Sequence, residues 1–264
     1  ETVGSIYEVP LVYEEYNLAQ LIANKLNLGT VKPKLKEWKT LVRKIKKERE
    51  PMKIALVGKY THLEDAYISV IESLKIACYH QDRQLELIWV DSEKLEQDDE
   101  RTWKKLKEAS GMVIPGGFGI RGTEGKIKAA RYARENKVPY LGLCLGMQIL
   151  TIEFARNALS DPQITSEEFD EKGKIDREKY VIHFLPGQHA EKEKGGTLRL
   201  GAYPCKLIPG TKTKKLYGDK NKVNERHRHR YEFNNKFKAK LKNKGLTVSG
   251  IYPKQNLVEI VEIK

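Results

Sequence analysis

The chain has 264 residues, of which 39% are hydrophobic and 32% are charged, and this composition is typical of a soluble globular protein. No apolar run approaches the roughly 18 residues that a membrane span needs. The three cysteines are sparse and indicate neither a disulfide framework nor a zinc site, so we expect a cytoplasmic protein. The formal net charge of +13 lies in lysine-rich segments without interleaved aromatic residues, which favours a solvated basic surface over a nucleic-acid-binding one.

The first 50 residues contain too little apolar sequence to form a core of their own. Apolar spacing predicts a helix over 13–28 that ends at Gly29, and a basic segment, 32–50, follows it up to Pro51. We interpret residues 1–50 as the end of another domain with a linker helix, and residues 51–264 as a second domain.

From residue 52 onward, strand-like and helix-like segments alternate. The pattern predicts strands at 53–57, 85–90, 112–114 and 140–143, and helices at 65–80, 101–109, 123–136 and 149–159. Such strand–helix units predict an α/β fold, with a mostly parallel open sheet flanked by helices. Beyond residue 159 short β-like runs follow, with one helix at 236–243, so we expect an added antiparallel β portion; these runs are 180–185, 197–207, 226–233, 247–251 and 257–263.

A cysteine lies at the junction of a predicted strand and a predicted helix. Residues 142–148 read Gly-Leu-Cys-Leu-Gly-Met-Gln, a nucleophile elbow with Cys144 in the place of serine. The two flanking glycines permit the tight turn, and the sulfur stands at the positive end of the following helix. The electrostatic field at this end of the helix favours the thiolate over the thiol, so the motif predicts a reactive cysteine. The alternative is a buried cysteine in a glycine-rich turn.

A second glycine-rich loop follows the preceding predicted strand. Residues 115–119 read Pro-Gly-Gly-Phe-Gly, and alone they would indicate only a turn. Because the carboxyl ends of parallel strands meet at one rim of the sheet, this loop is expected beside Cys144. The backbone N–H groups of Gly117 and Leu145 are therefore candidates for an oxyanion hole that would stabilise acyl transfer to the sulfur.

The residues of 225–232 (ERHRHRYE) would alternate between the two faces of a strand. One face would carry Glu225, His227, His229 and Tyr231, and the other Arg226, Arg228, Arg230 and Glu232. The three arginines of one face require carboxylates or an anion nearby. His227 and His229 could chelate a metal with Glu225, or one of them could act as the base for Cys144. We favour a structural role for both and predict no metal site in this chain.

Two smaller features have both a binding and a solvent-exposed interpretation. Glu167 and Glu168 could bind an ammonium group, or they could form a solvated acidic loop. Lys59 and Tyr60, at the end of the first predicted strand, could contact a phosphate or a base, or the lysine could extend to solvent.

Seven motifs resemble those of the CTP synthase family in order and spacing. They are SIYEVP at 5–10, VGKY at 57–60, DAY at 65–67, PGGFGIRG at 115–122, GLCLGMQ at 142–148, GGTLRLG at 195–201 and ERHRHRYE at 225–232. The elbow alone indicates a class I glutamine amidotransferase, and the last two motifs narrow the resemblance to this family. It extends over essentially the whole chain, because the first motif is similar to the end of the family's amidoligase domain.

The resemblance implies a glutaminase that serves pyrimidine nucleotide biosynthesis. Cys144 would attack the side-chain amide of glutamine and form a thioester, and the ammonia would aminate UTP at a synthetase site that uses ATP. The implied glutamine-binding residues are Gly117, Phe118, Leu145, Gly146, Met147, Gln148, Glu168 and Arg230. Among these, Glu168 would meet the substrate ammonium and Arg230 its carboxylate end. The loop 195–199 would be a lid over the site.

The resemblance also implies an activator and further partners. GTP would activate the glutaminase step, with Lys59, Tyr60, Phe118 and Arg121 as its candidate contacts. No cofactor is expected in this chain, because ATP and Mg²⁺ belong to a synthetase domain of the same polypeptide. The intact protein is expected to form a tetramer.

Parts of the family pattern lie outside the sequence. The synthetase domain would precede Glu1, and the catalytic His-Pro-Glu motif would follow Lys264, so a chain of residues 1–264 is expected not to hydrolyse glutamine at a normal rate. Three alternatives remain: the glutaminase part of another class I amidotransferase, a catalytically incomplete assembly or regulatory chain, and a basic nucleic-acid-binding protein.

Overall fold

The computed structural model describes residues 3–30, 32–184 and 199–263 of the chain. It divides into two compact units, one of Glu1–Met52 with Ile71–Leu85 and the other of Lys53–Val70 with Glu86–Lys264. The expected assignment of residues 1–50 to another domain, with a boundary at residue 51, stays a prediction. Of the segments expected from the sequence, 185 and 195–198 lie outside the described residues.

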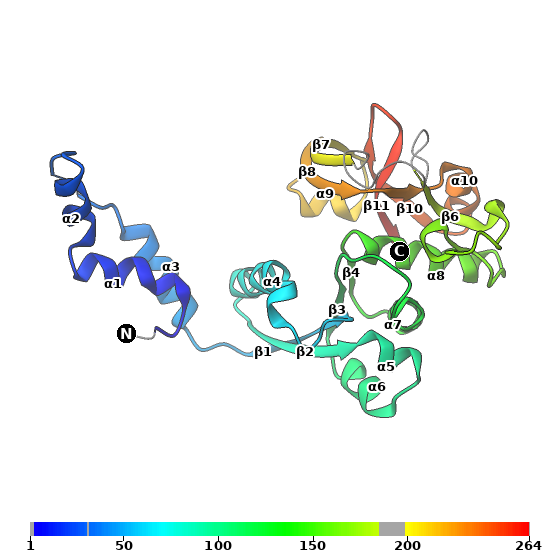
Figure 1. Ribbon diagram of the computed structural model, residues 1–264, viewed down its shortest axis with the longest axis horizontal. Helices are drawn as coiled ribbons and strands as arrows, with labels where there is room; N and C mark the ends of the chain where they lie inside the picture. The colour runs from blue at the N-terminus through cyan, green and yellow to red at the C-terminus, as the bar shows by residue number, and fades with distance from the viewer. Residues whose placement is uncertain (1–2, 31, 185–198, 264) are drawn as a thin grey trace. The chain divides into compact units, whose positions relative to one another are not determined.

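The first unit consists of helices (Figure 1). They are η1 (Ile6–Glu8), α1 (Val9–Glu15), α2 (Leu18–Lys25), α3 (Lys36–Lys46) and most of α4 (Ile68–His80). The single helix expected over 13–28 is two helices, because Asn17 has a left-handed backbone with φ 54° and ends α1. The indole of Trp38 donates to the Tyr7 carbonyl at 2.7 Å, and this bond ties α3 to the start of the unit.

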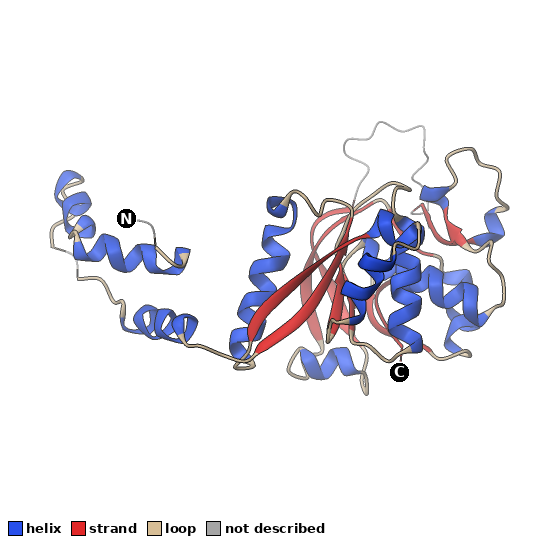
Figure 2. Ribbon diagram, turned by 90° about the horizontal axis from the view of Figure 1, so that it is seen from below, coloured by secondary structure: helices blue, strands red, loops and turns tan. Residues whose placement is uncertain are grey.

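The second unit contains the predicted open sheet, with helices packed on it (Figure 2). Its strands are β1 (Pro51–Gly58), β2 (Gln84–Asp91), β3 (Gly111–Ile114) and β4 (Tyr140–Gly142), in the order β2-β1-β3-β4. Strand β3 pairs in parallel with both β1 and β4. The helices that alternate with these strands are α5 (Ser92–Glu96), α6 (Glu100–Lys107), α7 (Thr123–Glu135) and α8 (Leu145–Ala158). The predicted fold class is thereby confirmed.

The antiparallel portion forms two further sheets. One has the order β11-β10-β7-β8, from β7 (Arg199–Leu207), β8 (Lys222–His229), β10 (Leu246–Tyr252) and β11 (Leu257–Ile263). The other has the order β5-β6-β9, from β5 (Thr165–Ser166), β6 (Tyr180–Phe184) and β9 (Tyr231–Phe233). The single run expected at 226–233 is thus two strands, because the chain turns at Arg230 and passes from one sheet to the other. Short helices α9 (Lys212–Leu216) and α10 (Lys238–Lys242) complete the unit.

One hydrophobic core joins the sheets of the second unit. Helix α8 lies at its centre, with Ile149, Ile152 and Ala155 fully buried. The core continues into the antiparallel portion through residues such as Val181 and Phe233. The nucleophile elbow therefore stands on the most deeply packed helix of the unit, so its position is held rigidly.

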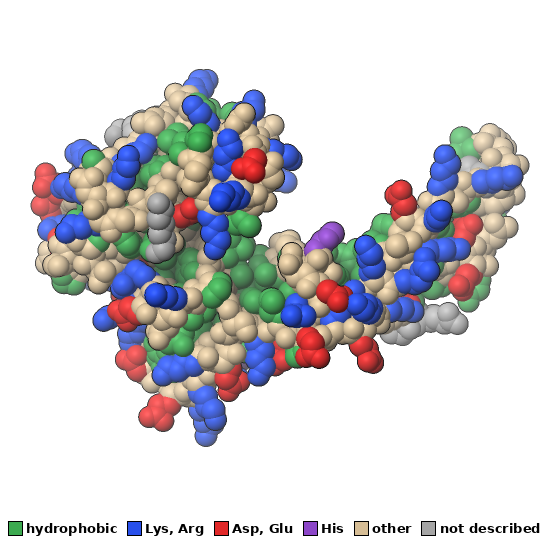
Figure 3. Space-filling model, turned by 180° about the vertical axis from the view of Figure 1, so that it is seen from behind, with side chains coloured by type: hydrophobic (Ala, Val, Ile, Leu, Met, Phe, Trp, Pro, Cys, Tyr) green, Lys and Arg blue, Asp and Glu red, His purple; other side chains and the backbone are tan. Residues whose placement is uncertain are grey.

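The surface carries the excess of basic residues without one dominant patch on the face in Figure 3. Lysine and arginine side chains are interspersed there with aspartate and glutamate. Within the described residues, no helix is both long enough and apolar enough to cross a membrane.

Candidate active site

Cys144 stands at the turn between β4 and α8, at the N-cap position of the helix. Its backbone has φ 54° and ψ −107°, a region that non-glycine residues rarely occupy. The residue is exposed, in contrast to Cys78 and Cys205, which are buried. The strained turn therefore presents this side chain at the rim of the sheet, which is the geometry of a nucleophile elbow.

The two glycines of the elbow are required by close backbone contacts. A β-carbon on Gly146 would lie 2.1 Å from the carbonyl oxygen of Ile114 on β3. One on Gly142 would lie 2.4 Å from the carbonyl carbon of Gly146. Real β-carbons do not approach that closely, so only glycine lets the start of α8 pack directly against the sheet.

The change Gly146→Ala is therefore expected to destabilise the fold by about 1–3 kcal/mol, because the methyl group meets main chain that cannot move aside. Gly111→Ala is the matched control on the same sheet, since the nearest atom to its added β-carbon would be 3.4 Å away. Chemical denaturation of both variants measures the difference. Equal losses of unfolding free energy would contradict this account of the elbow.

The loop 115–119 lies beside the sulfur. A β-carbon on Gly116 would be 3.9 Å from Cys144 Sγ, and the backbone N–H groups of Gly117 and Leu145 are close enough to the thiol to lower its pKa. Two N–H groups, one from the loop after β3 and one from the start of α8, therefore lie near the nucleophile. An oxyanion hole requires this arrangement, although its role here stays a prediction.

The pKa of the Cys144 thiol differs from what its position at the N-terminus of a helix predicts. Burial raises the pKa of the Cys144 thiol, although part of the residue reaches the surface, and the charges of Glu168 and Glu232 raise it further. The hydrogen bonds from Leu145 and Gly117 lower the pKa but do not offset the rise. The thiol pKa is thus raised where the helix-field argument predicted that it would be lowered.

Glu168 faces the glycine-rich loop. Its Oε1 atom accepts the N–H of Gly119 at 2.8 Å. Burial raises the pKa of Glu168, while the Gly119 bond and the cations of Lys59, Arg230 and Lys126 lower it. The neighbouring Glu167 instead accepts the N–H of Phe184, at 2.8 Å, and caps β6.

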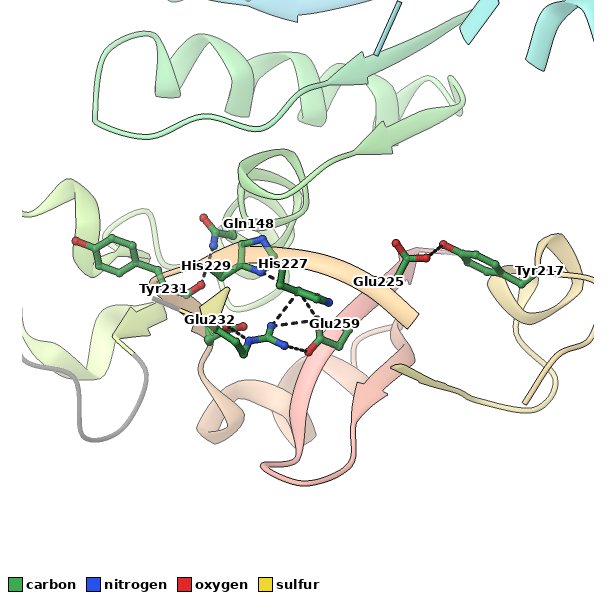
Figure 4. A network of polar contacts seen from close by, with 9 residues as sticks. Gln148, Tyr217, Glu225, His227, His229, Tyr231, Glu232 and Glu259 are labelled. Atoms are coloured by element: carbon green, nitrogen blue, oxygen red, sulfur yellow. Dashed lines mark hydrogen bonds and ion pairs between the residues drawn. The ribbon is translucent and has the colours of Figure 1, made fainter. Parts of the chain in front are cut away.

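The turn after β8 is attached to the helix of the nucleophile. Gln148 is buried, and its Nε2 atom donates to the carbonyl of Tyr231 at 3.1 Å (Figure 4). Arg230 lies at this turn and is close enough to Glu168 to influence its charge. The structure therefore brings Gln148, Glu168 and Arg230 to the same part of the unit, and their role in binding glutamine stays a prediction.

The four candidate effector contacts also lie together. Lys59 Nζ donates to the carbonyl of Phe118 at 2.6 Å, and it stands 5.0 Å from the Phe118 ring centre and 5.4 Å from that of Tyr60. The guanidinium of Arg121 lies 5.5 Å from the Tyr60 ring centre and is paired with Glu93 at 2.7 Å. The Phe118 side chain itself is 71% exposed.

The histidines of β8 are parts of a buried polar network. His227 Nδ1 lies 3.1 Å from His229 Nδ1 and 3.2 Å from Arg199 Nη2. Burial lowers the pKa of both histidines to about 4, helped by the charge of Arg199. Among the residues that the structure describes, no cluster of His, Cys, Asp or Glu could hold a metal ion. Arg226 and Arg228 are exposed on the other face of the strand, so they do not need the buried anion that was expected.

The low pKa values of His227 and His229 indicate that the fold loses stability as the pH falls. Each has a pKa lower in the folded than in the unfolded state, so the unfolded chain binds more protons between about pH 6.5 and 4. Their contribution to stability is complete above pH 6.5 and falls as the pH drops through this window. His229→Gln is expected to flatten the decrease in melting temperature between pH 7 and 4. An unchanged slope in the variant would contradict this assignment.

The sequence interpretation missed three buried charged residues near the site. Arg199 was expected both at the end of a lid, 195–199, and in a β-like run, 197–207; it begins β7 and is only 4% exposed. Glu232 is 4% exposed and Lys126 3% exposed. Burial lowers the pKa of Lys126 to about 8. Only Arg199, between Leu198 and Leu200, is a charged residue inside an apolar run, whereas Lys126 and Glu232 lie in charged sequence that gives no such signal.

Comparisons with known proteins agree with this geometry. Residues 62–264 match the family model of class-I glutamine amidotransferases. The chain is 51% identical over 263 residues to the CTP synthase of Herpetosiphon aurantiacus and 50% identical over 264 residues to that of Roseiflexus castenholzii. These alignments take in 100% of this chain but only 48% and 46% of the two relatives, so the chain spans about half of their length.

Among solved structures, the chain resembles the glutaminase domain of Trypanosoma brucei CTPS, a structure with bound acivicin. The TM-score is 0.71 and the identity 35%, and the match covers 80% of each chain. The fold, the elbow and the family model define this chain as a class I glutamine amidotransferase. Within that class, the chain belongs to the CTP synthase family.

Proposed function

We propose that this chain is the glutaminase part of a CTP synthase, in which glutamine is hydrolysed at Cys144 and the ammonia is supplied to the amination of UTP. The observation that carries the proposal is the exposed Cys144 on its strained turn, with the N–H groups of Gly117 and Leu145 directed at the sulfur. No other described cysteine combines exposure with such donors, since Cys78 and Cys205 are buried.

The proposed reaction begins when the thiolate of Cys144 attacks the side-chain carbonyl carbon of glutamine. The carbonyl electrons move to the oxygen, and the N–H groups of Gly117 and Leu145 stabilise the resulting oxyanion. The C–N bond then breaks, the nitrogen takes up the proton that the Cys144 thiol released on ionisation and leaves as ammonia, and a γ-glutamyl thioester remains on the sulfur. Water hydrolyses the thioester, which releases glutamate and restores the thiol.

Recognition of the substrate is assigned to the residues around the elbow. The carboxylate of Glu168 would bind the α-ammonium of glutamine, and Arg230 would lie near its α-carboxylate, so that both charges are matched. Phe118, Gly146, Met147 and Gln148 would complete the pocket. His227 and His229 are not proposed as the base, because they are engaged in the Arg199 network and have pKa values of about 4.

A purine nucleotide is the proposed effector. Tyr60 and Phe118 offer aromatic faces, and Lys59 and Arg121 offer cations beside them. A base could stack on the rings while phosphates pair with the cations, and GTP, as implied by the family resemblance, satisfies both requirements. This part of the proposal concerns regulation and is independent of the role of Cys144.

The remaining parts of the proposal concern the whole protein. A synthetase domain of the same polypeptide would use ATP and Mg²⁺ to activate UTP and would receive the ammonia. We propose a tetramer in the cytoplasm, with no cofactor bound by this chain and no nucleic-acid or membrane partner.

The test is a comparison of nitrogen donors with the purified full-length protein. CTP formation is measured with glutamine and, separately, with ammonia. Glutamine-dependent CTP formation supports the proposed glutaminase function and its coupling to the amination of UTP. Glutamine hydrolysis without amination of UTP would favour another class I amidotransferase, and no hydrolysis at all would favour the assembly or regulatory chain.

A further inference from the structure

The corner between β8 and β9 is held from two sides, and both attachments are buried. On one side, Gln148 of α8 donates to the carbonyl of Tyr231 at 3.1 Å. Gln148 follows Cys144 by one helical turn, so this bond sets the distance between the nucleophile and the corner. Arg230 of the proposed substrate pocket lies at the same corner. Any shift of the corner would therefore change the pocket.

On the other side, the next residue is held through its side chain (Figure 4). Glu232 Oε1 accepts a hydrogen bond from Arg199 Nε at 3.0 Å. The same guanidinium makes a fork with Glu259 of β11, with Nη1 at 2.8 Å and Nη2 at 3.2 Å from its two oxygens. The three side chains are between 3% and 5% exposed. Arg199 thus connects β9 of one sheet to β7 and β11 of the other.

The guanidinium is confined on its remaining sides. Its Nη2 atom lies 3.2 Å from His227 Nδ1. Its central carbon stands 5.0 Å from the ring centre of Tyr203 and 5.6 Å from that of Tyr252. A planar fork between two rings and two carboxylates is a geometry that arginine satisfies and lysine does not.

The network holds one carboxylate more than the guanidinium can neutralise. His227 and His229 contribute no positive charge near neutral pH, because burial lowers the pKa of each to about 4. Burial and the charge of Glu259 raise the pKa of Glu232 to about 7, against the opposing effect of Arg199. The charge of Glu232 also acts on Cys144, whose pKa it raises.

We propose that Arg199 is a positioning residue of the glutamine pocket, which acts by holding Glu232 and thereby the corner at residues 230–231. The inference rests on the proposed glutaminase function. Arg199 touches neither the nucleophile nor the proposed substrate contacts, so its effect is indirect. The ion pair between Arg199 and Glu232 is strongest when Glu232 is ionised. Glutamine binding accordingly weakens as the pH falls below neutrality.

The first test is Arg199→Lys in the full-length protein, with KM for glutamine and kcat measured separately. The lysine keeps the charge but cannot hold both carboxylates, so KM is expected to rise about tenfold, with a smaller change in kcat. Arg134→Lys is the matched control: Arg134 makes a partly buried fork with Glu153 of α8, with distances of 2.9 Å and 2.7 Å, away from the corner. The control is expected to lose stability but keep its KM. Equal KM values for all three proteins would overturn the proposal.

The second test is Glu232→Gln, which keeps the shape of the side chain and removes the excess charge. Between pH 6 and 8, KM of the wild type is expected to fall as Glu232 ionises, whereas KM of the variant stays at the low-pH value of the wild type. If KM of the variant shows the same pH dependence as that of the wild type, the proposed role of the Arg199–Glu232 pair is contradicted, even if Arg199→Lys fails to fold. A wild type without glutaminase activity would instead refute the proposed function, so the two failures are distinguishable.

Discussion

Replacing Cys144 with alanine is expected to abolish glutamine-dependent activity, with a loss of at least about 10³-fold, because no other nucleophile can form the thioester. Activity with ammonia as the nitrogen donor is expected to persist, since it does not require the glutaminase step. The two rates are measured on the same full-length protein. The retained ammonia-dependent rate also shows that the synthetase site of the variant is intact.

An electrophilic analogue of glutamine offers a direct probe of the sulfur. Mass spectrometry is expected to find one adduct on Cys144 in the wild type and none in Cys144→Ala. Cys78→Ala is the control and is expected to be modified like the wild type, because Cys78 is buried. Modification of another cysteine, or glutamine turnover by Cys144→Ala, would show that Cys144 is not the nucleophile.

The architecture of the sheet was predictable because it depends on local patterns. Alternating strands and helices with short loops leave few topologies other than an open parallel sheet, and the expected elements around Cys144 are present. The elbow was predictable for the same reason, because Gly142, Cys144 and Gly146 lie within five positions. The two glycines indicate a turn that has no room for a β-carbon at either position.

The features that could not be predicted depend on contacts between distant residues. Arg199 pairs with Glu232 and Glu259, which follow it by 33 and 60 positions, so alternation within one strand gives no sign of the network. The strand switch at Arg230 was missed because the period-2 pattern continues through the turn and identifies a face but not a sheet. The break at Asn17 was missed because the apolar spacing continues across it.

The pKa of Cys144 shows the limit of local reasoning most directly. The position at a helix N-terminus lowers a thiol pKa, and that much follows from the motif. Burial opposes this effect most strongly, and the charges of Glu168 and Glu232 add to it from segments 24 and 88 positions further along the chain. The proposed ammonium of the substrate would pair with Glu168 and remove part of this opposition, so substrate binding itself would favour the thiolate.

Glu168→Gln is expected to raise KM for glutamine by about 10- to 100-fold, which corresponds to the loss of one charge-assisted hydrogen bond in a partly buried site. The amide keeps the size of the side chain and can still accept the N–H of Gly119, so the loop 115–119 is expected to stay in place. Removing the negative charge also lowers the pKa of Cys144, so kcat is expected to change much less than KM.

Glu167→Gln is the matched control, because its neighbouring carboxylate caps Phe184 and has no proposed contact with substrate. Its KM is expected to equal that of the wild type. The decisive comparison uses glutaramate, which is glutamine without its α-amino group. If Glu168 binds the α-ammonium, the variant Glu168→Gln and the wild type should use glutaramate with the same KM, since neither can form the pair. A rise in KM for both substrates would show instead that Glu168 supports the loop rather than the ammonium, and the assignment of the substrate's orientation would be lost.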